Sequence, residues 1–226
     1  MKFGIPNLID AVGELPERSN ILFITPPRPE KSIFVAHYIN EGLKSQQPAV
    51  YISTDISPSE IEAKANTFGW NFAQYTNNKL WFVDCYSWAL EKKPVERKDI
   101  RVSGPSSLDD MSLSINQAVC EANKIGPIGR VVFQSLSTLL IYNSPGIVYK
   151  FCQVIGARLK SSGMTTLFMV EEGMHKTDVL ATLEHMMDGI IEVKLEEGRW
   201  FISSSQIKAS GKVEVRVTDK GIEVIR

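Results

Sequence analysis

The sequence has few cysteines, no long apolar run and almost no net charge. Its three cysteines lie far apart and lack the spacing of a metal site: Cys85, Cys120 and Cys152. No stretch approaches the roughly 20 apolar residues of a membrane-spanning helix, and the first residues lack an apolar run of signal-peptide length. We therefore expect a cytoplasmic protein that uses neither a membrane nor a bound metal ion.

The overall charge also argues against a strong electrostatic attraction to a highly charged partner. There are 25 basic and 26 acidic side chains, which give a formal net charge of -1. Such a balance does not favour tight attachment to nucleic acid or to anionic lipid. The 226 residues, 43% of them hydrophobic, are enough to bury one substantial core, so we expect a single domain spanning residues 1–226.

Short apolar runs alternate with longer segments of helical period, which is typical of an α/β protein. Most of the runs are apolar throughout, as buried parallel strands are. The predicted strands are Asn20 to Thr25, Ala49 to Ser53, Leu80 to Asp84, Arg130 to Gln134 and Thr165 to Val170. The predicted helices are Glu30 to Leu43, Ser57 to Phe68, Ser107 to Asn123, Gly146 to Ser161 and Thr177 to Met187. The pattern predicts a central, mainly parallel, twisted sheet flanked by helices.

After Asp188 the pattern changes to strands separated by turn residues. The predicted strands are Ile190 to Leu195, Trp200 to Ser205, Val213 to Val217 and Ile222 to Ile225. Because the connections are short, we expect these strands to extend the sheet in antiparallel fashion.

The segment from Leu90 to Ser107 fits neither pattern. It is charged, contains two prolines and lacks apolar periodicity, which predicts a long exposed loop. Its acidic side chains are interleaved with basic ones, which favours a solvated loop over a phosphate-binding one. The basic side chains that could meet phosphate are Lys92, Lys93, Arg97, Lys98 and Arg101.

The first strand is followed by residues that resemble a phosphate loop. In GxxxxGK[ST] loops, backbone N–H groups surround phosphate oxygens while the lysine and hydroxyl address the terminal phosphate and Mg²⁺. Here the eight positions run from Thr25 to Ser32, and Lys31 and Ser32 match the pattern. Thr25 and Glu30 stand where the two glycines would be. Together with the preceding Gly4 to Asp10, this segment resembles the KaiC- and RadA-like members of the RecA superfamily, which implies a RecA-like P-loop NTPase fold.

The substitutions in this loop have physical consequences. Pro26, Pro27 and Pro29 have no N–H to donate, and Glu30 places a carboxylate where phosphate oxygens would lie. We expect Glu30 to pair with Lys31 or Arg28, or to act as an internal anion at the start of its helix. These departures from the loop of the family predict that ATP binds weakly or not at all, and we expect no cofactor.

Three further elements differ from what the resemblance implies. Asp55 stands for one of two consecutive glutamates that polarise the attacking water, and Ile56 replaces the other. Gln134 stands for the aspartate that holds the Mg²⁺-bound water, and it lacks the negative charge that a hard cation favours. Gln206 and Lys208 stand for the lysine and arginine that reach the nucleotide of a neighbouring subunit. A lysine does not reproduce the planar fork of arginine.

The strand from Leu80 to Asp84 is rich in aromatic residues. By resemblance to RadA-like proteins it lies at the sheet edge, where a peptide can add as an extra strand. The predicted binding residues are Trp81, Phe82 and Tyr86.

A second cluster, Glu171, Glu172 and His175, suggests a metal or acid-base site. A surface loop inherited from an active ancestor explains it adequately, and we favour that interpretation.

These observations predict a pseudo-ATPase that binds a protein or peptide partner, such as an active RecA-family relative. One alternative is a weak ATPase of the KaiC or RadA type, in which Lys31, Ser32 and Asp55 act within a homo-oligomer. Another is an accessory factor in DNA repair that binds single-stranded DNA through the basic loop.

Overall fold

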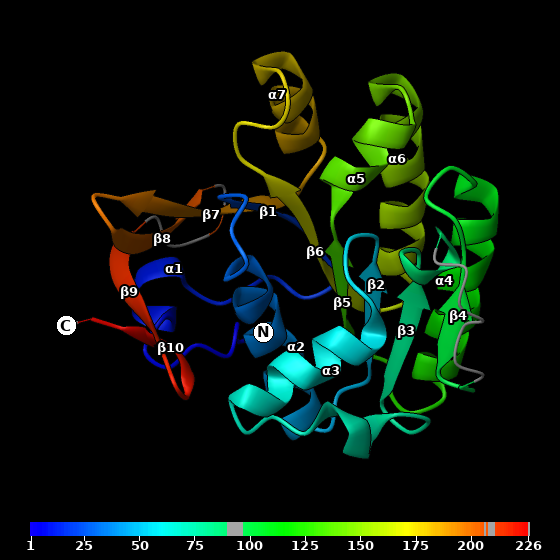
Figure 1. Ribbon diagram of the computed structural model, residues 1–226, viewed down its shortest axis with the longest axis horizontal. Helices are drawn as coiled ribbons and strands as arrows, with labels where there is room; N and C mark the ends of the chain where they lie inside the picture. Colours follow the sequence, from blue (N-terminus) through cyan, green and yellow to red (C-terminus); the bar gives the residue numbers. More distant parts are fainter. Residues whose placement is uncertain (90–96, 206, 208–210, 226) are drawn as a thin grey trace.

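The computed structural model describes residues 1–89, 97–205, 207 and 211–225. Ten strands form one sheet in the order β10-β9-β8-β7-β1-β6-β5-β2-β3-β4 (Figure 1). The strands are β1 (Asn20–Thr25), β2 (Ala49–Ser53), β3 (Leu80–Asp84), β4 (Ile100–Val102), β5 (Gly129–Gln134), β6 (Met164–Glu171), β7 (Gly189–Glu196), β8 (Arg199–Ser205), β9 (Lys212–Thr218) and β10 (Gly221–Val224). Pairing is parallel from β7 to β4 and antiparallel from β7 to β10, so the predicted α/β fold is confirmed.

Helices cover both faces of this sheet and bury a core on each. The α-helices are α1 (Ile9–Val12), α2 (Lys31–Lys44), α3 (Pro58–Thr67), α4 (Leu108–Asn123), α5 (Leu136–Tyr142), α6 (Pro145–Ser161) and α7 (Thr177–His185). Apolar residues of α1, α2 and α3 pack on one face, and those of α4, α5, α6 and α7 on the other. The central strands are therefore buried on both sides, which explains why they are apolar throughout. No helix among the described residues is long and apolar enough to cross a membrane.

The helix beginning at Pro58 illustrates how local sequence sets an element. Ser57 accepts a hydrogen bond from the Glu60 amide, and the Glu60 side chain accepts one from the Ser57 amide. This reciprocal capping satisfies two N–H groups that the first turn leaves unpaired. Pro58 follows at the first helical position, where its missing N–H costs nothing.

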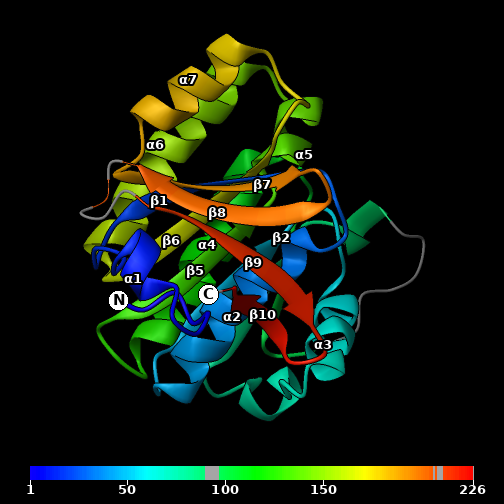
Figure 2. The ribbon, with the colours of Figure 1, turned by 90° about the vertical axis from the view of Figure 1, so that its left-hand side faces the viewer.

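The antiparallel strands β8, β9 and β10 curl away from the parallel part of the sheet. Figure 2 shows β9 and β10 lying in front of α2, with α1 to their left. His37 of α2 accepts a hydrogen bond of 2.6 Å from the Ile222 amide of β10, which fastens this last hairpin to the core. The C-terminal strands are thus part of the same packed structure.

The predicted exposed loop from Leu90 to Ser107 is wrong for much of its described part. Residues 90–96 lie outside the described residues, but Ile100–Val102 forms β4, which pairs in parallel with β3. It follows that β3 is not the sheet edge, and the edge-strand position inferred for Trp81, Phe82 and Tyr86 is corrected. Trp81 and Phe82 are buried, while Tyr86 is partly exposed.

An ion-pair network explains why this charged segment is ordered beside the sheet. Arg97 donates two hydrogen bonds of 2.8 Å to Glu62 of α3 and pairs with Asp99, which is completely buried. The backbone carbonyl of Asp99 accepts a hydrogen bond from the Phe82 amide of β3. Because Glu62 and Phe82 lie far from Arg97 and Asp99 in the chain, no local pattern could indicate the contacts that they make. They also occupy Arg97, one of the five residues predicted to meet phosphate.

We expect Arg97→Met to destabilise the fold, because it leaves the buried Asp99 carboxylate without its cation. The free energy of unfolding should fall by about 2 kcal/mol in urea titrations. Amide exchange at Phe82 and Ser103, which hold β4 to β3, should accelerate. Arg101→Met is the matched control, since the described contacts of the Arg101 guanidinium are with backbone carbonyls. Equal stability of the two variants would contradict this role.

Candidate functional site

Four neighbouring strands bring polar side chains to one edge of the sheet. β2, β5, β6 and β1 are adjacent and parallel, so their carboxyl ends meet. Lys31 and Ser32 begin α2 shortly after β1, Asp55 follows β2, and Gln134 ends β5. The predicted residues of the phosphate loop and of the two acidic elements therefore come together, and Glu171 joins them at the end of β6.

Lys31 is held between two carboxylates. Its Nζ lies 2.6 Å from Oδ2 of Asp55 and also donates to Oε1 of Glu171. Burial of the ammonium lowers the pKa of Lys31, but the two carboxylates outweigh this effect and the pKa is raised. The cation that a phosphate loop offers to a nucleotide is thus already paired within the chain.

Glu171 is itself fixed by hydroxyl groups. Ser135 donates to its Oε2 at 2.6 Å, and the Glu171 amide donates to Oγ of Ser137 at 3.0 Å. Burial raises the pKa of Glu171, but the Lys31 cation and the two serine hydroxyls more than offset this, so the pKa is lowered. Glu171 is only 3% exposed, so the surface-loop interpretation of this residue is wrong: it ends a buried strand.

Gln134 connects the remaining members of the site. Its Nε2 donates to Oδ1 of Asp55 at 2.9 Å and to Oγ of Ser32 at 3.2 Å, and its Oε1 accepts from the Tyr51 hydroxyl at 2.6 Å. Burial, followed by the Asp55 carboxylate, raises the pKa of Tyr51, so this phenol keeps the proton that it donates. An aspartate at position 134 would have no N–H and would face Asp55 as a like charge. The neutral amide therefore fits this network where a carboxylate would not.

The loop from 25 to 32 satisfies part of its own backbone. The Arg28 amide donates to the Pro26 carbonyl at 2.8 Å, and the Lys31 amide to the Arg28 carbonyl at 3.1 Å. The Thr25 hydroxyl donates to the Pro26 carbonyl. Since three further positions are proline, few N–H groups of this loop remain for an added anion.

The expected pairing of Glu30 is wrong. Among the described contacts Glu30 pairs with neither Lys31 nor Arg28, it makes no capping hydrogen bond to α2, and its Oε2 is buried without a partner. The physical reason is that Lys31 is directed to the strand ends, where Asp55 and Glu171 reach it. The Glu30 carboxylate therefore stays unpaired within the loop, as a negative group additional to Asp55 and Glu171.

A pocket of about 360 Å³ opens above this network. Its charged lining consists of Arg28, Lys31, Asp55 and Glu171, so two positive groups face two negative ones. Within the described chain, no group of three or more His, Cys, Asp or Glu residues is placed to hold a metal ion. The positive and negative side chains that line the pocket therefore balance in number, so a ligand meets a lining whose charges compensate one another.

Several members of the site were not predicted from the sequence. Glu171 was considered only in a cluster with Glu172 and His175, although its place directly after an apolar run that predicts a buried parallel strand puts it at the same sheet edge as the other site residues. Tyr51, Ser135 and Ser137 carried no comparable signal. His175 lies nearby, with burial lowering its pKa and Glu171 opposing that effect, and its Nε2 is buried without a partner. The predicted intersubunit residues Gln206 and Lys208 lie outside the described residues.

A sheet of this order, with Lys31 and Ser32 starting the helix after its central strand, defines a RecA-like P-loop NTPase fold. The family described as "ATPase: KaiC" matches residues 1–225. The chain belongs to this KaiC ATPase family.

Individual proteins agree with this assignment. A UPF0273 protein from Methanopyrus kandleri is 27% identical over 232 residues, covering 98% of this chain and 90% of its own length. The circadian clock oscillator protein KaiC from Prochlorococcus marinus is 24% identical over 161 residues, covering 70% of this chain and 30% of its own. The crystal structure of a KaiC-like protein from Pyrococcus horikoshii superposes with a TM-score of 0.77 at 18% identity, over 100% of this chain and 98% of that one.

Proposed function

We propose that this chain is a non-catalytic member of the KaiC family, a pseudo-ATPase that acts by binding a protein partner. The observation that carries the proposal is the pairing of Lys31 with both Asp55 and Glu171. A nucleotide phosphate would have to displace two carboxylates, one of them 3% exposed, and leave them near its own negative charge. In an active site of this kind the loop lysine pairs with a phosphate, whereas here Asp55 and Glu171 take the place of that anion.

The position of Gln134 supports the same proposal. A hydroxyl at the Ser32 position and a carboxylate at the Gln134 position are the groups with which a P-loop protein holds Mg²⁺. Here the Gln134 amide directs an N–H donor at Oγ of Ser32. A cation placed between the two would meet an N–H group at Gln134 instead of a second oxygen ligand. Without Mg²⁺ the charge that develops during phosphoryl transfer is not neutralised.

The test combines titration calorimetry with a hydrolysis assay, using ATP and ADP with and without Mg²⁺. We expect no phosphate release above that of Lys31→Met, the matched variant that lacks the loop cation. The triple variant Glu30→Gly, Gln134→Asp and Glu171→Gln removes a carboxylate from the loop, adds a metal-seeking one and releases Lys31 from its buried acidic partner. We expect Mg²⁺-dependent ATP binding to appear in that variant and to be absent from the parent. Parent turnover that Lys31→Met abolishes would overturn the proposal.

A weak ATP-binding or ATPase activity is the second candidate function. It is favoured by one observation: Lys31 and Ser32 begin a 14-residue helix beneath an open pocket, and a helix start attracts anions. Under this alternative, ATP would bind to the parent protein and protect Lys31 from acylation. The calorimetric titration separates the two functions directly.

A further inference from the structure

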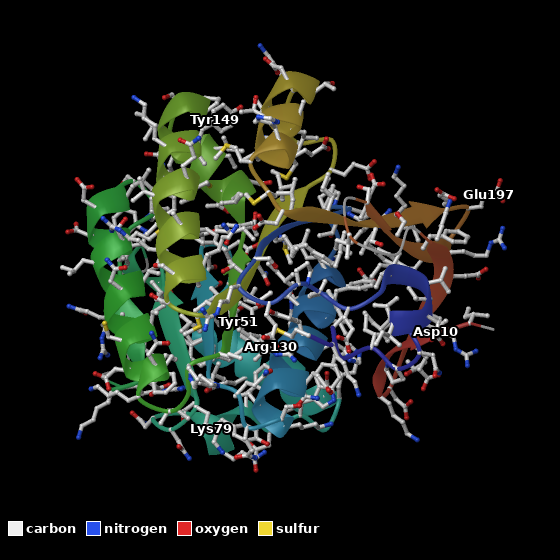
Figure 3. The ribbon with its side chains drawn as sticks, turned by 180° about the vertical axis from the view of Figure 1, so that it is seen from behind. Asp10, Tyr51, Lys79, Arg130, Tyr149 and Glu197 are labelled. Atoms are coloured by element: carbon white, nitrogen blue, oxygen red, sulfur yellow. The ribbon has the colours of Figure 1, made fainter. Side chains whose placement is uncertain are left out.

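A pocket of about 910 Å³ lies at the amino end of the parallel strands, opposite the end where Lys31 lies. It is bounded by the beginning of β3, by β4 and the residues before it, and by the last turns of α4. Lys79, which immediately precedes β3, marks this end of the sheet at the bottom of Figure 3. We call it the β3–β4 pocket, and its lining residues are Asn77, Trp81, Arg97, Lys98, Arg101 and Glu121.

Trp81 brings an unused hydrogen-bond donor to this pocket. The side chain is only 6% exposed, because its ring packs in the core beneath α4. An indole N–H can only donate, and when it is buried it usually finds an acceptor. No described residue accepts a hydrogen bond from Nε1 of Trp81, and this atom is not among the enclosed atoms that lack a partner. The N–H therefore reaches the surface of the pocket that Trp81 lines.

Arg101 of β4 presents a second unused donor group. Its Nη1 donates to the carbonyl of Lys98 at 2.6 Å and to that of Ile100 at 3.3 Å. These two bonds fix the direction of the guanidinium, whereas Nε and Nη2 meet no acceptor among the described residues. The edge formed by Nε and Nη2 matches two oxygens of one anion. Arg101 is thus oriented before a ligand arrives.

The other charges of the lining leave the β3–β4 pocket positive. Lys98 is exposed and pairs with no described carboxylate. Arg97 is already neutralised by its two carboxylate partners. Glu121 is the one carboxylate among the described lining residues, and Lys124 pairs with it at 2.8 Å. The uncompensated charges are therefore those of Lys98 and Arg101.

We propose that the β3–β4 pocket binds the phosphate group of a small molecule. The indole of Trp81, the free edge of Arg101 and the ammonium of Lys98 are all donors, and a phosphate monoester offers three acceptor oxygens to them. A carboxylate has only two oxygens to share among the three. Because the Lys31 network lies at the other end of the sheet, this proposal is independent of the proposed function.

The size and charge of the pocket favour a small molecule over a nucleic acid. A volume of about 910 Å³ exceeds that of a phosphate group, so the rest of the ligand is also enclosed. Two uncompensated cations in a chain of net charge -1 do not form the extended basic groove that follows a nucleic-acid backbone.

The experiment follows the indole N–H signals of the four tryptophans by nitrogen–proton NMR while inorganic phosphate is added. Constant pH and ionic strength remove general screening effects. The Trp81 signal, assigned with Trp81→Phe, should shift and saturate with a half-saturation concentration on the order of 1 mM. Acetate should bind about fivefold more weakly or less, because it lacks the third acceptor oxygen. Phosphate at the loop would leave this signal in place, since Lys31 lies at the opposite end of the strands.

Arg101→Met should weaken phosphate binding about tenfold, because a charge-assisted contact with two hydrogen bonds is lost. Arg101→Lys keeps the charge without the planar fork, so its affinity should fall between those of Arg101→Met and the parent. Arg216→Met is the matched control, since Arg216 is an exposed arginine of β9, far from β4 in the order of the sheet. It should bind phosphate like the parent.

A Trp81 signal that phosphate does not move overturns the proposal. Equal weakening by Arg101→Met and Arg216→Met would also overturn it, because only the total charge would then matter. An oligothymidylate that saturates the signal at a lower concentration of phosphate groups than inorganic phosphate would identify a nucleic acid as the ligand, against the proposal. The dispersion of the same spectra shows whether each variant is folded, and the titration of the parent needs no variant.

Discussion

Replacing Lys31 with methionine should lower the free energy of unfolding by about 3 kcal/mol at neutral pH, because two carboxylates then lose their shared cation. Lys31 is 17% exposed, and its partners Asp55 and Glu171 are 21% and 3% exposed. The serine hydroxyls would still hold Glu171, but the charge itself would be buried without compensation. Urea unfolding monitored by fluorescence measures the difference.

The pH dependence gives this prediction a direction. In the parent the pKa of Glu171 is lowered, so its stabilising contribution is present above its ordinary pKa and is lost as pH falls through the folded value. In Lys31→Met the principal cause of that lowering is gone, so burial, opposed only by the serine hydroxyls, moves the pKa of Glu171 upward relative to the parent. The deficit of the variant should therefore shrink as the pH is lowered towards about 4.

A double-mutant cycle supplies the control. Glu171→Gln keeps an acceptor for Ser135 and removes the charge, so adding it to Lys31→Met should recover part of the lost stability. Under the alternative that Lys31 is kept free for a nucleotide, its removal would cost little. Lys31→Met as stable as the parent, or costs that simply add, would show that the ion pairs do not hold the site.

The parallel strands could be predicted from the sequence because each is an apolar run long enough to be buried on both faces. The elements that were missed are short or depend on distant contacts. β4 has three residues within a charged segment, and its position depends on the contact of Arg97 with Glu62, which lies 35 residues away in the chain. α5 has seven residues, and its one local signal is the capping of Ser137 by the Ser135 side chain.

The site follows the same division. Lys31, Asp55 and Gln134 could be predicted to converge because parallel strands end at one edge of a sheet. The pairing of Lys31 with Glu171 could not be predicted, since Glu30 is the neighbour of Lys31 in sequence while Glu171 is 140 residues away. Which carboxylate pairs with the lysine is decided by the direction of its side chain and by the serine hydroxyls that fix Glu171. Neither is written in a local pattern.

Acidification should destabilise the protein well above the pH at which carboxylates titrate, because His37 is buried in its neutral form. Its pKa is lowered to about 4, first by burial and to a lesser extent by Lys44, while a hydrogen bond with the Gly4 backbone opposes the shift. Its Nε2 accepts the Ile222 amide, so protonation would remove the acceptor. A Cβ on Gly221 would lie 2.4 Å from this Nε2. The hairpin therefore packs against the imidazole ring too closely for a different hydrogen-bond partner to reach Nε2.

The direction and size of this loss of stability follow from the lowered pKa of His37. The unfolded chain takes up the proton near pH 6.5, whereas the folded chain resists it until about pH 4, so stability is full above 6.5 and is lost between the two values. The loss amounts to about 3 kcal/mol at the lower end, at 1.36 kcal/mol for each unit of pKa. Urea titrations at intervals between these two pH values measure it.

His37→Gln separates this cause from all other titrations, because its amide oxygen can accept the Ile222 N–H but does not gain a proton in this range. The variant should be less stable at pH 8, since glutamine does not fill the space beside Trp70, yet its stability should change less between pH 6.5 and 4. His185→Gln, at the exposed end of α7, should keep the parent profile. If His37→Gln loses stability with falling pH as steeply as the parent does, the neutral imidazole is not what holds the C-terminal hairpin to α2.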